Sequence, residues 1–228
     1  PLRLPPAVLG LAFSPDGSRL AIPFGAIPSE DDGSEVRDVG SGQRLARLPV
    51  DGEILTVAFS PDGSLLAGGQ GEPHTGVAGG VDGTSLLWAT DGWRRIGAPL
   101  ALRNASALAV AFSPDGRTLA TSHADGTVVL WDVASQRPIG SPLPGPTDLR
   151  GDPTGAPGSA GPASMTARFT PDGSRLFALH ENGQAFGWEV DPNAWRQHAC
   201  STVGGGLAPE QWEELVPGQD YIEACPSG

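Results

Sequence analysis

The chain has 228 residues and a formal net charge of −12, because 26 acidic residues outnumber 14 basic ones, all of them arginine. The absence of lysine excludes a Schiff-base or phosphate-loop lysine in this chain, and the acidic balance argues against a nucleic-acid partner. No stretch approaches the roughly 18 apolar residues of a membrane-spanning helix. The 33 Gly and 23 Pro residues accompany regular bursts of apolar residues, so we expect most of them in turns.

A seven-residue pattern occurs four times, at residues 11–17, 57–63, 110–116 and 167–173. Each copy alternates at period two and then reads Ser/Thr-Pro-Asp-Gly. The alternation predicts a half-buried strand, and Pro-Asp-Gly predicts a hairpin turn, because proline presets φ and glycine accepts a positive φ. The turn residues that carry this repeat are Asp16, Gly17, Asp62, Gly63, Asp115, Gly116, Asp172 and Gly173.

A second element follows each copy and is best preserved at residues 124–132. There Asp125-Gly126 predicts a turn and Trp131-Asp132 ends the next strand, while partial copies end at Trp88 and Trp188 and the first copy carries Arg37 instead. With strands expected at 118–122, 127–132 and 137–143, each unit has four short antiparallel strands in roughly 40–45 residues. That spacing is typical of one blade of a β-propeller.

These turns and Trp-terminated strands resemble the WD-repeat family. The resemblance implies an all-β propeller with four visible four-stranded blades, at about 7–50, 51–103, 104–145 and 162–190, followed by a helical tail at 191–228. The Gly-His pair that the family carries before the first strand is missing. We therefore expect an incomplete version of the family's buried His–Asp–Ser–Trp network, formed from Asp125, Thr121 or Ser122, and Trp131.

Four blades lie at the lower end of the usual range of four to eight, so we expect part of a larger ring. Residues 1–5 precede the first strand and are either the last strand of an earlier blade or a clasp strand that closes the ring. We favour the earlier blade. This predicts an open stack whose exposed edge aggregates when the chain is produced alone. A sharply cooperative melt of a soluble monomer would contradict it.

The tail begins with Asp191-Pro192, a helix start that replaces the fourth strand of the last blade. We expect helices at 193–199 and 209–215. The tail resembles the one that closes WD-repeat regions in large actinobacterial signalling proteins, where an N-terminal STAND-type NTPase, and sometimes kinase, protease or TIR modules, are fused to the propeller. The residues that carry this resemblance are Asp191, Pro192, Trp195, Ala199, Cys200, Pro209, Trp212, Leu215, Pro217, Gly218, Tyr221, Cys225 and Pro226.

Cys200 and Cys225 are the only cysteines. A disulfide or a reduced, proximal pair ranks first, and a metal pair with His198 ranks last, because the spacing fits no zinc template. We expect a cytoplasmic protein, which a reduced pair suits, whereas a disulfide between Cys200 and Cys225 would favour an extracytoplasmic one. We expect no metal at His123 and His180 either, since two ligands at matching blade positions are too few for zinc.

Three insertions, at 26–34, 70–82 and 144–163, are expected on one face of the propeller. Variable loops on a fixed scaffold usually bind partners, although neutral insertions explain them nearly as well. The acidic residues Glu30, Asp31, Asp32 and Glu35 lie close together in the sequence. We expect them to form a solvated loop rather than a calcium site, because the EF-hand pattern is absent. The candidate interaction residues are Glu30, Asp31, Asp32, His74, Asp148 and Arg150.

The sequence therefore predicts a non-catalytic interaction scaffold or sensor, without cofactor or metal, whose partner is a protein or the chain's own upstream effector domain. A structural clasp that holds the effector domain inactive is a related hypothesis. The alternative is an enzyme or ligand-binding propeller with a central-channel site. It is disfavoured because no nucleophile motif occurs and because the starts of the first strands, Val8, Ile54, Ala107 and Ser164, are apolar or small.

Overall fold

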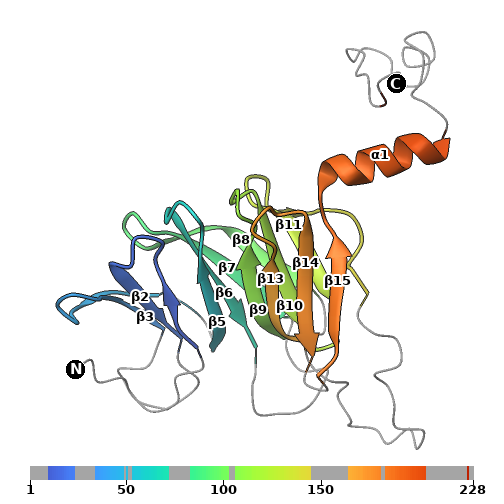
Figure 1. The fold of residues 1–228 in the computed structure, drawn as a ribbon. Helices are drawn as coiled ribbons and strands as arrows, with labels where there is room; N and C mark the ends of the chain where they lie inside the picture. The colour runs from blue at the N-terminus through green and yellow to red at the C-terminus, as the bar shows by residue number, and fades with distance from the viewer. Residues whose placement is uncertain are drawn as a thin grey trace, which may run out of the picture.

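The computed structural model describes residues 10–23, 34–48, 50, 53–71, 83–102, 106–144, 164–180, 183–203 and 225. The described chain is built of antiparallel sheets, which we call blades 1 to 4 in chain order, and one helix (Figure 1). Among the described residues no helix is long and apolar enough to cross a membrane.

Blade 1 contains β1 (Ala12–Phe13), β2 (Arg19–Ile22), β3 (Glu35–Asp38) and β4 (Arg44–Arg47). Blade 2 contains β5 (Ile54–Phe59), β6 (Leu65–Gln70), β7 (Gly83–Ala89) and β8 (Arg94–Leu102). Blade 3 contains β9 (Ala107–Phe112), β10 (Thr118–His123), β11 (Val128–Asp132) and β12 (Arg137–Pro138). Blade 4 contains β13 (Ser164–Phe169), β14 (Arg175–His180) and β15 (Ala185–Glu189), and α1 (Pro192–Val203) follows it.

Each blade pairs its strands in sequence order, as the propeller prediction required. The described sheet of blade 4 has three strands, because α1 takes the place of a fourth, as the helix start at Asp191-Pro192 predicted. One detail of the prediction was wrong. In blade 3 the fourth strand is shorter than 137–143: Leu143 pairs with Val128 only as an isolated bridge, after Gly140 turns the chain with a φ of +70°.

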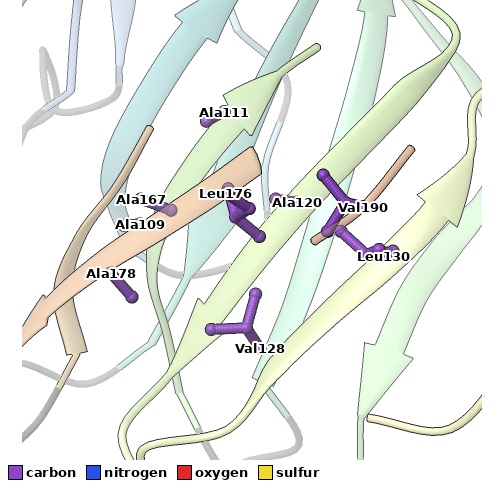
Figure 2. Packing of buried hydrophobic residues seen from close by; sticks show 9 residues of the cluster. All are labelled: Ala109, Ala111, Ala120, Val128, Leu130, Ala167, Leu176, Ala178 and Val190. Carbon is purple, nitrogen blue, oxygen red and sulfur yellow. The ribbon is translucent and has the colours of Figure 1, made fainter. Parts of the chain in front are cut away.

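Apolar clusters join neighbouring blades in three successive interfaces. Val36 of blade 1 lies in one cluster with Ile54 and Trp88 of blade 2, and Ala67 of blade 2 lies in the next with Val110 of blade 3. The third interface places Ala109, Ala111, Ala120, Val128 and Leu130 of blade 3 against Ala167, Leu176, Ala178 and Val190 (Figure 2). Blades 1 and 4 lie at opposite ends of this row, so the described blades form an open stack (Figure 1).

The helix α1 starts where the sequence predicts but ends later than residue 199. Asp191 caps it, because Asn193 donates its backbone N–H to Asp191 Oδ1 at 2.9 Å. Trp195 donates its indole N–H to the carbonyl of Glu189 at 2.8 Å and so ties the first turn to β15. The helix predicted at 209–215 and the segment 1–5 lie outside the described residues.

Candidate interaction surface

The four Ser/Thr-Pro-Asp-Gly turns are nearly identical in geometry. In the third, Ser113 donates its hydroxyl to Asp115 Oδ1 at 2.6 Å, and the same oxygen accepts the backbone N–H of Arg117 at 3.0 Å. Gly116 closes the turn by donating its N–H to the Ser113 carbonyl at 2.9 Å, with a φ of +72°. The turns therefore place the carboxylates of four aspartates along one face: Asp16, Asp62, Asp115 and Asp172.

These hydrogen bonds also keep the four aspartate carboxylates on this face negatively charged. The hydroxyl of Ser14, followed by the backbone and side chain of Ser18, lowers the pKa of Asp16 to about 2. Hydrogen bonds from Ser60, Ser113 and Thr170 are the main causes that lower the pKa of Asp62, Asp115 and Asp172 respectively. All four carboxylates are consequently ionised at neutral pH, because hydrogen bonding favours the charged form.

The turns stack on one another from blade to blade. A Cβ placed on Gly63 would lie 3.4 Å from Pro15 Cδ, one on Gly116 3.5 Å from Pro61 Cδ, and one on Gly173 3.4 Å from Pro114 Cδ. Each proline thus packs on the glycine of the following turn. This recurring contact, which we call the turn ladder, continues the apolar interfaces between blades out to the surface.

A groove of about 240 Å³ lies where the first two turns meet. Thr90 donates its hydroxyl to the Gly63 carbonyl at 2.7 Å, at a position occupied by Val133 and Val190 in the following blades. The Arg19 guanidinium lies 5.6 Å from the ring centre of Trp93, within the range of a cation–π contact. The residues that line this groove are Ser14, Pro15, Asp16, Arg19, Asp62, Gly63, Ser64 and Thr90.

A buried polar network stabilises blade 3. Trp131 donates its indole N–H to Thr121 Oγ1 at 2.9 Å, and the same hydroxyl lies 2.9 Å from His123 Nε2. The expectation for Asp125 was wrong, because its carboxylate lies in the exposed turn and accepts the backbone N–H and the hydroxyl of Thr127. His123 was missed as a member. Its spacing of two from Thr121 on one strand, which puts both side chains on one face, was the available signal.

A family comparison gives an independent result: the model described as "WD domain, G-beta repeat" matches residues 42–89 and 103–132. The first range covers β4 of blade 1 and β5 to β7 of blade 2, and the second covers β9 to β11 of blade 3. Residues 42–89 and 103–132 therefore match the WD-repeat family, in agreement with the resemblance of the turns and of the Trp-terminated strands. No curated protein is similar enough to the chain to count as a match.

The WD-repeat tryptophan position differs among the blades. Trp88 of blade 2 is fully buried, and its Nε1 has no hydrogen-bond partner among the described residues. The reason is that Gly68 stands where blade 3 has Thr121, and a Cβ there would lie 2.9 Å from Trp88 Cζ3. The ring of Trp88 therefore fills the space of the missing hydroxyl-bearing side chain.

In blade 1, Arg37 occupies the position that tryptophan has in the other blades. The Arg37 guanidinium is paired with the buried carboxylate of Glu35, whose second oxygen lies 3.7 Å from Arg44 Nη1. The prediction that Glu35 lies in a solvated acidic loop was therefore wrong. A buried carboxylate needs such partners, because an unpaired charge away from water is costly.

The two cysteines form a disulfide. Cys200 of α1 and Cys225 are bonded with a Cα–Cα separation of 5.4 Å. This favours the disulfide over the reduced pair and over the metal site with His198. Among the described residues, no group of three or more His, Cys, Asp or Glu side chains could hold a metal ion.

The candidate residues of the predicted interaction loops lie outside the described residues. They are Glu30, Asp31, Asp32, His74, Asp148 and Arg150. The strand ends show where these loops attach: one leaves after Ile22 and returns at Glu35, and another leaves after Gln70 and returns at Gly83. At the starts of the first strands, Ile54 and Ala107 are fully buried, and Ile54 lies in the apolar cluster between blades 1 and 2. Those two positions present no polar group for a central-channel site, whereas Val8 lies outside the described residues.

Proposed function

We propose that this chain is a non-catalytic protein-interaction module whose binding residues lie on the loops that join the second and third strands and the successive blades. The contrast between the two faces of the blades supports this proposal. On the turn face, four near-identical turns are held by the same hydrogen bonds. On the opposite face, the second-to-third connection is short in blade 3, between His123 and Val128, and much longer in blade 2.

The difference between the uniform turn face and the variable loop face has a physical reason. The turn ladder and the apolar interfaces keep the strand ends fixed, so loops of different length can be attached without loss of the core. The candidate residues Glu30, Asp31 and Asp32 would add negative charge to that face, and so a partner with a basic surface is favoured.

Affinity capture tests the proposal. The 228-residue chain is compared with a variant that lacks residues 71–80 and 150–160, and with the variant Arg117→Ser as a control on the exposed turn face. We expect the deletion to leave far-UV circular dichroism nearly unchanged and to weaken partner capture about tenfold or more, whereas Arg117→Ser leaves capture unchanged. Unchanged capture by the deletion variant would contradict the proposal.

We further propose that the module is the C-terminal WD-repeat part of a larger bacterial signalling protein with a STAND-type NTPase or a kinase upstream. The resemblance of the tail supports this, and Asp191, Pro192 and Trp195 adopt a capped helix that is tied to β15. The reading frame upstream of the codon for Pro1 tests it. An NTPase or kinase domain in that frame supports the proposal, and a frame without one contradicts it.

We infer the compartment of the module from the redox state of Cys200 and Cys225. The disulfide favours an oxidising compartment over the cytoplasm, because reducing systems keep cytoplasmic thiols reduced. Alkylation of the native protein in cell extracts, followed by mass spectrometry, measures this state. Blocked thiols on both cysteines would place the protein in the cytoplasm instead.

A further inference from the structure

The helix α1 lies outside the apolar clusters that hold the blades together. None of its described side chains belongs to any of the three clusters. Trp195, its largest side chain, is 37% exposed, and Arg196, Gln197 and His198 are exposed as well. A helix without a buried apolar face receives little stability from packing, and a helix of 12 residues is marginal in water by itself.

Local interactions hold the first turn of α1 but not the last. Asp191 caps the first turn, and the indole of Trp195 ties it to β15. The last turn has no basic residue that could interact favourably with the helix dipole. The hydroxyls of Ser201 and Thr202 both donate to the carbonyl of His198 at 2.8 Å, and such bonds to the preceding turn slightly destabilise a helix. The C-terminal half of α1 therefore needs another source of stability.

The disulfide is placed where that stability is needed. Cys200 lies in the C-terminal half of α1 and is bonded to Cys225, 25 residues further along the chain. A bond that closes a loop of this length removes entropy from the unfolded chain and so favours the folded one. Both cysteines are half-buried rather than enclosed in the core. Disulfides near the surface are more open to reduction than enclosed ones.

We propose that the Cys200–Cys225 disulfide is a redox-sensitive clasp that decides whether the C-terminal half of α1 is helical. In the reduced chain this half unfolds while the blades keep their fold, because α1 contributes no described side chain to the apolar clusters. A dithiol drives the change. It passes two electrons and two protons to the disulfide, which becomes two thiols, and the dithiol itself becomes a disulfide. The inference rests on α1 and the disulfide, and not on the proposed partner or signalling context.

Limited proteolysis with trypsin measures the state of α1. Arg196 lies in the helix and is the last arginine of a chain without lysine, so cleavage there releases residues 197–228 with both cysteines, in either redox state. We expect dithiothreitol to speed this cleavage about tenfold or more, because proteolysis follows the population of the unfolded segment. Removal of dithiothreitol and re-oxidation should restore the slow rate. Equal rates in the two redox states would overturn the proposal.

Two variants separate the disulfide from other effects of the reductant. The double variant Cys200→Ser, Cys225→Ser should be cleaved after Arg196 at the fast rate with and without dithiothreitol, since it cannot form the bond. The matched control Ser201→Ala changes the neighbour of Cys200 and should keep the dependence on dithiothreitol. Cleavage after Arg117, in an exposed turn, is the internal reference and should not respond. Slow cleavage of the double variant after Arg196 would overturn the proposal.

Hydrogen exchange shows whether the change stays within the helix. Reduction should lower the protection of the backbone amides of residues 196–203, whereas the amides of β13 to β15 should keep theirs. Unchanged protection of residues 196–203 would contradict the clasp. Loss of protection throughout blade 4 would contradict it as well, because the disulfide would then stabilise the blade rather than control the helix.

Discussion

Blades 2 and 3 place a tryptophan at the same register position and stabilise it in two different ways. Trp88 pairs with Leu66, and Trp131 pairs with Leu119 in the same arrangement of strands. In blade 3 the indole N–H is bonded to Thr121 Oγ1, whereas in blade 2 Gly68 leaves room for the ring and Nε1 has no partner in the described part of the chain. One sequence signal therefore corresponds to two solutions, a hydrogen bond in one blade and close packing in the other.

Removing either tryptophan should have the largest effect. Trp88→Ala and Trp131→Ala should each lower the free energy of unfolding by about 3–5 kcal/mol, because a buried ring is lost and a cavity remains. Trp188→Ala is the matched comparison and should cost less, since Trp188 is only partly buried in its cluster. Denaturant unfolding at one fixed protein concentration measures all three. An equal loss at Trp188 would contradict the assigned burial.

The hydroxyl of Thr121 should come next. Thr121→Val keeps the shape but removes the oxygen that Trp131 and His123 share, so we expect a loss of about 2 kcal/mol. Thr118→Val on the same strand is the control and should be near neutral. A double-mutant cycle with Trp131→Phe should shrink the Thr121 effect, because the indole N–H is then absent. Additive losses would show that the two side chains do not interact.

The close packing in blade 2 predicts a smaller loss. Gly68→Ala should destabilise the chain by about 1 kcal/mol, because the new Cβ meets the ring of Trp88. The control Gly40→Ala places its Cβ at an ordinary 3.6 Å from Asp38 Oδ1 and should cost less. In a Trp88→Leu background the Gly68→Ala penalty should disappear. A penalty that persists would assign the effect to the backbone.

The four turns should respond to pH with the smallest effect, and similarly in blades 2 and 3. The pKa of Asp16 is lowered from 3.8 to about 2 in the folded chain, so the folded state binds a proton less readily than the unfolded state. The turn contributes its stability above pH 4 and loses it as the pH falls through 2. Thermal melts across this range should show Ser60→Ala and Ser113→Ala with a flatter acid dependence than the parent. Ser201→Ala on α1 is the control.

The local patterns predicted most of the fold. Period-two alternation and Pro-Asp-Gly located the first and second strands of every blade, because both signals depend only on neighbouring residues. The capped start of α1 at Asp191 was predicted for the same reason. The short β12 was not predicted, because Gly140 interrupts a pattern that is otherwise apolar enough for a longer strand.

The candidate surface was predictable only in outline. Asp125 looked like a network residue from its place in the repeat, yet the neighbouring Thr127 takes its hydrogen bonds. Glu35 looked like part of an acidic loop, yet its alternation on β3 turns it toward Arg37 and away from water. In both cases the side chain is bonded to a residue two positions along the chain, Thr127 for Asp125 and Arg37 for Glu35. Composition does not reveal such a partner.

The sequence by itself determined the repeat, the turn chemistry and the position of each tryptophan, because these depend on local backbone preferences and on spacing. The tertiary structure alone decided that the prolines and glycines of successive turns form a ladder and that His123 joins Thr121 and Trp131. Those features depend on the register between blades, which is set by packing across residues that are far apart in the chain.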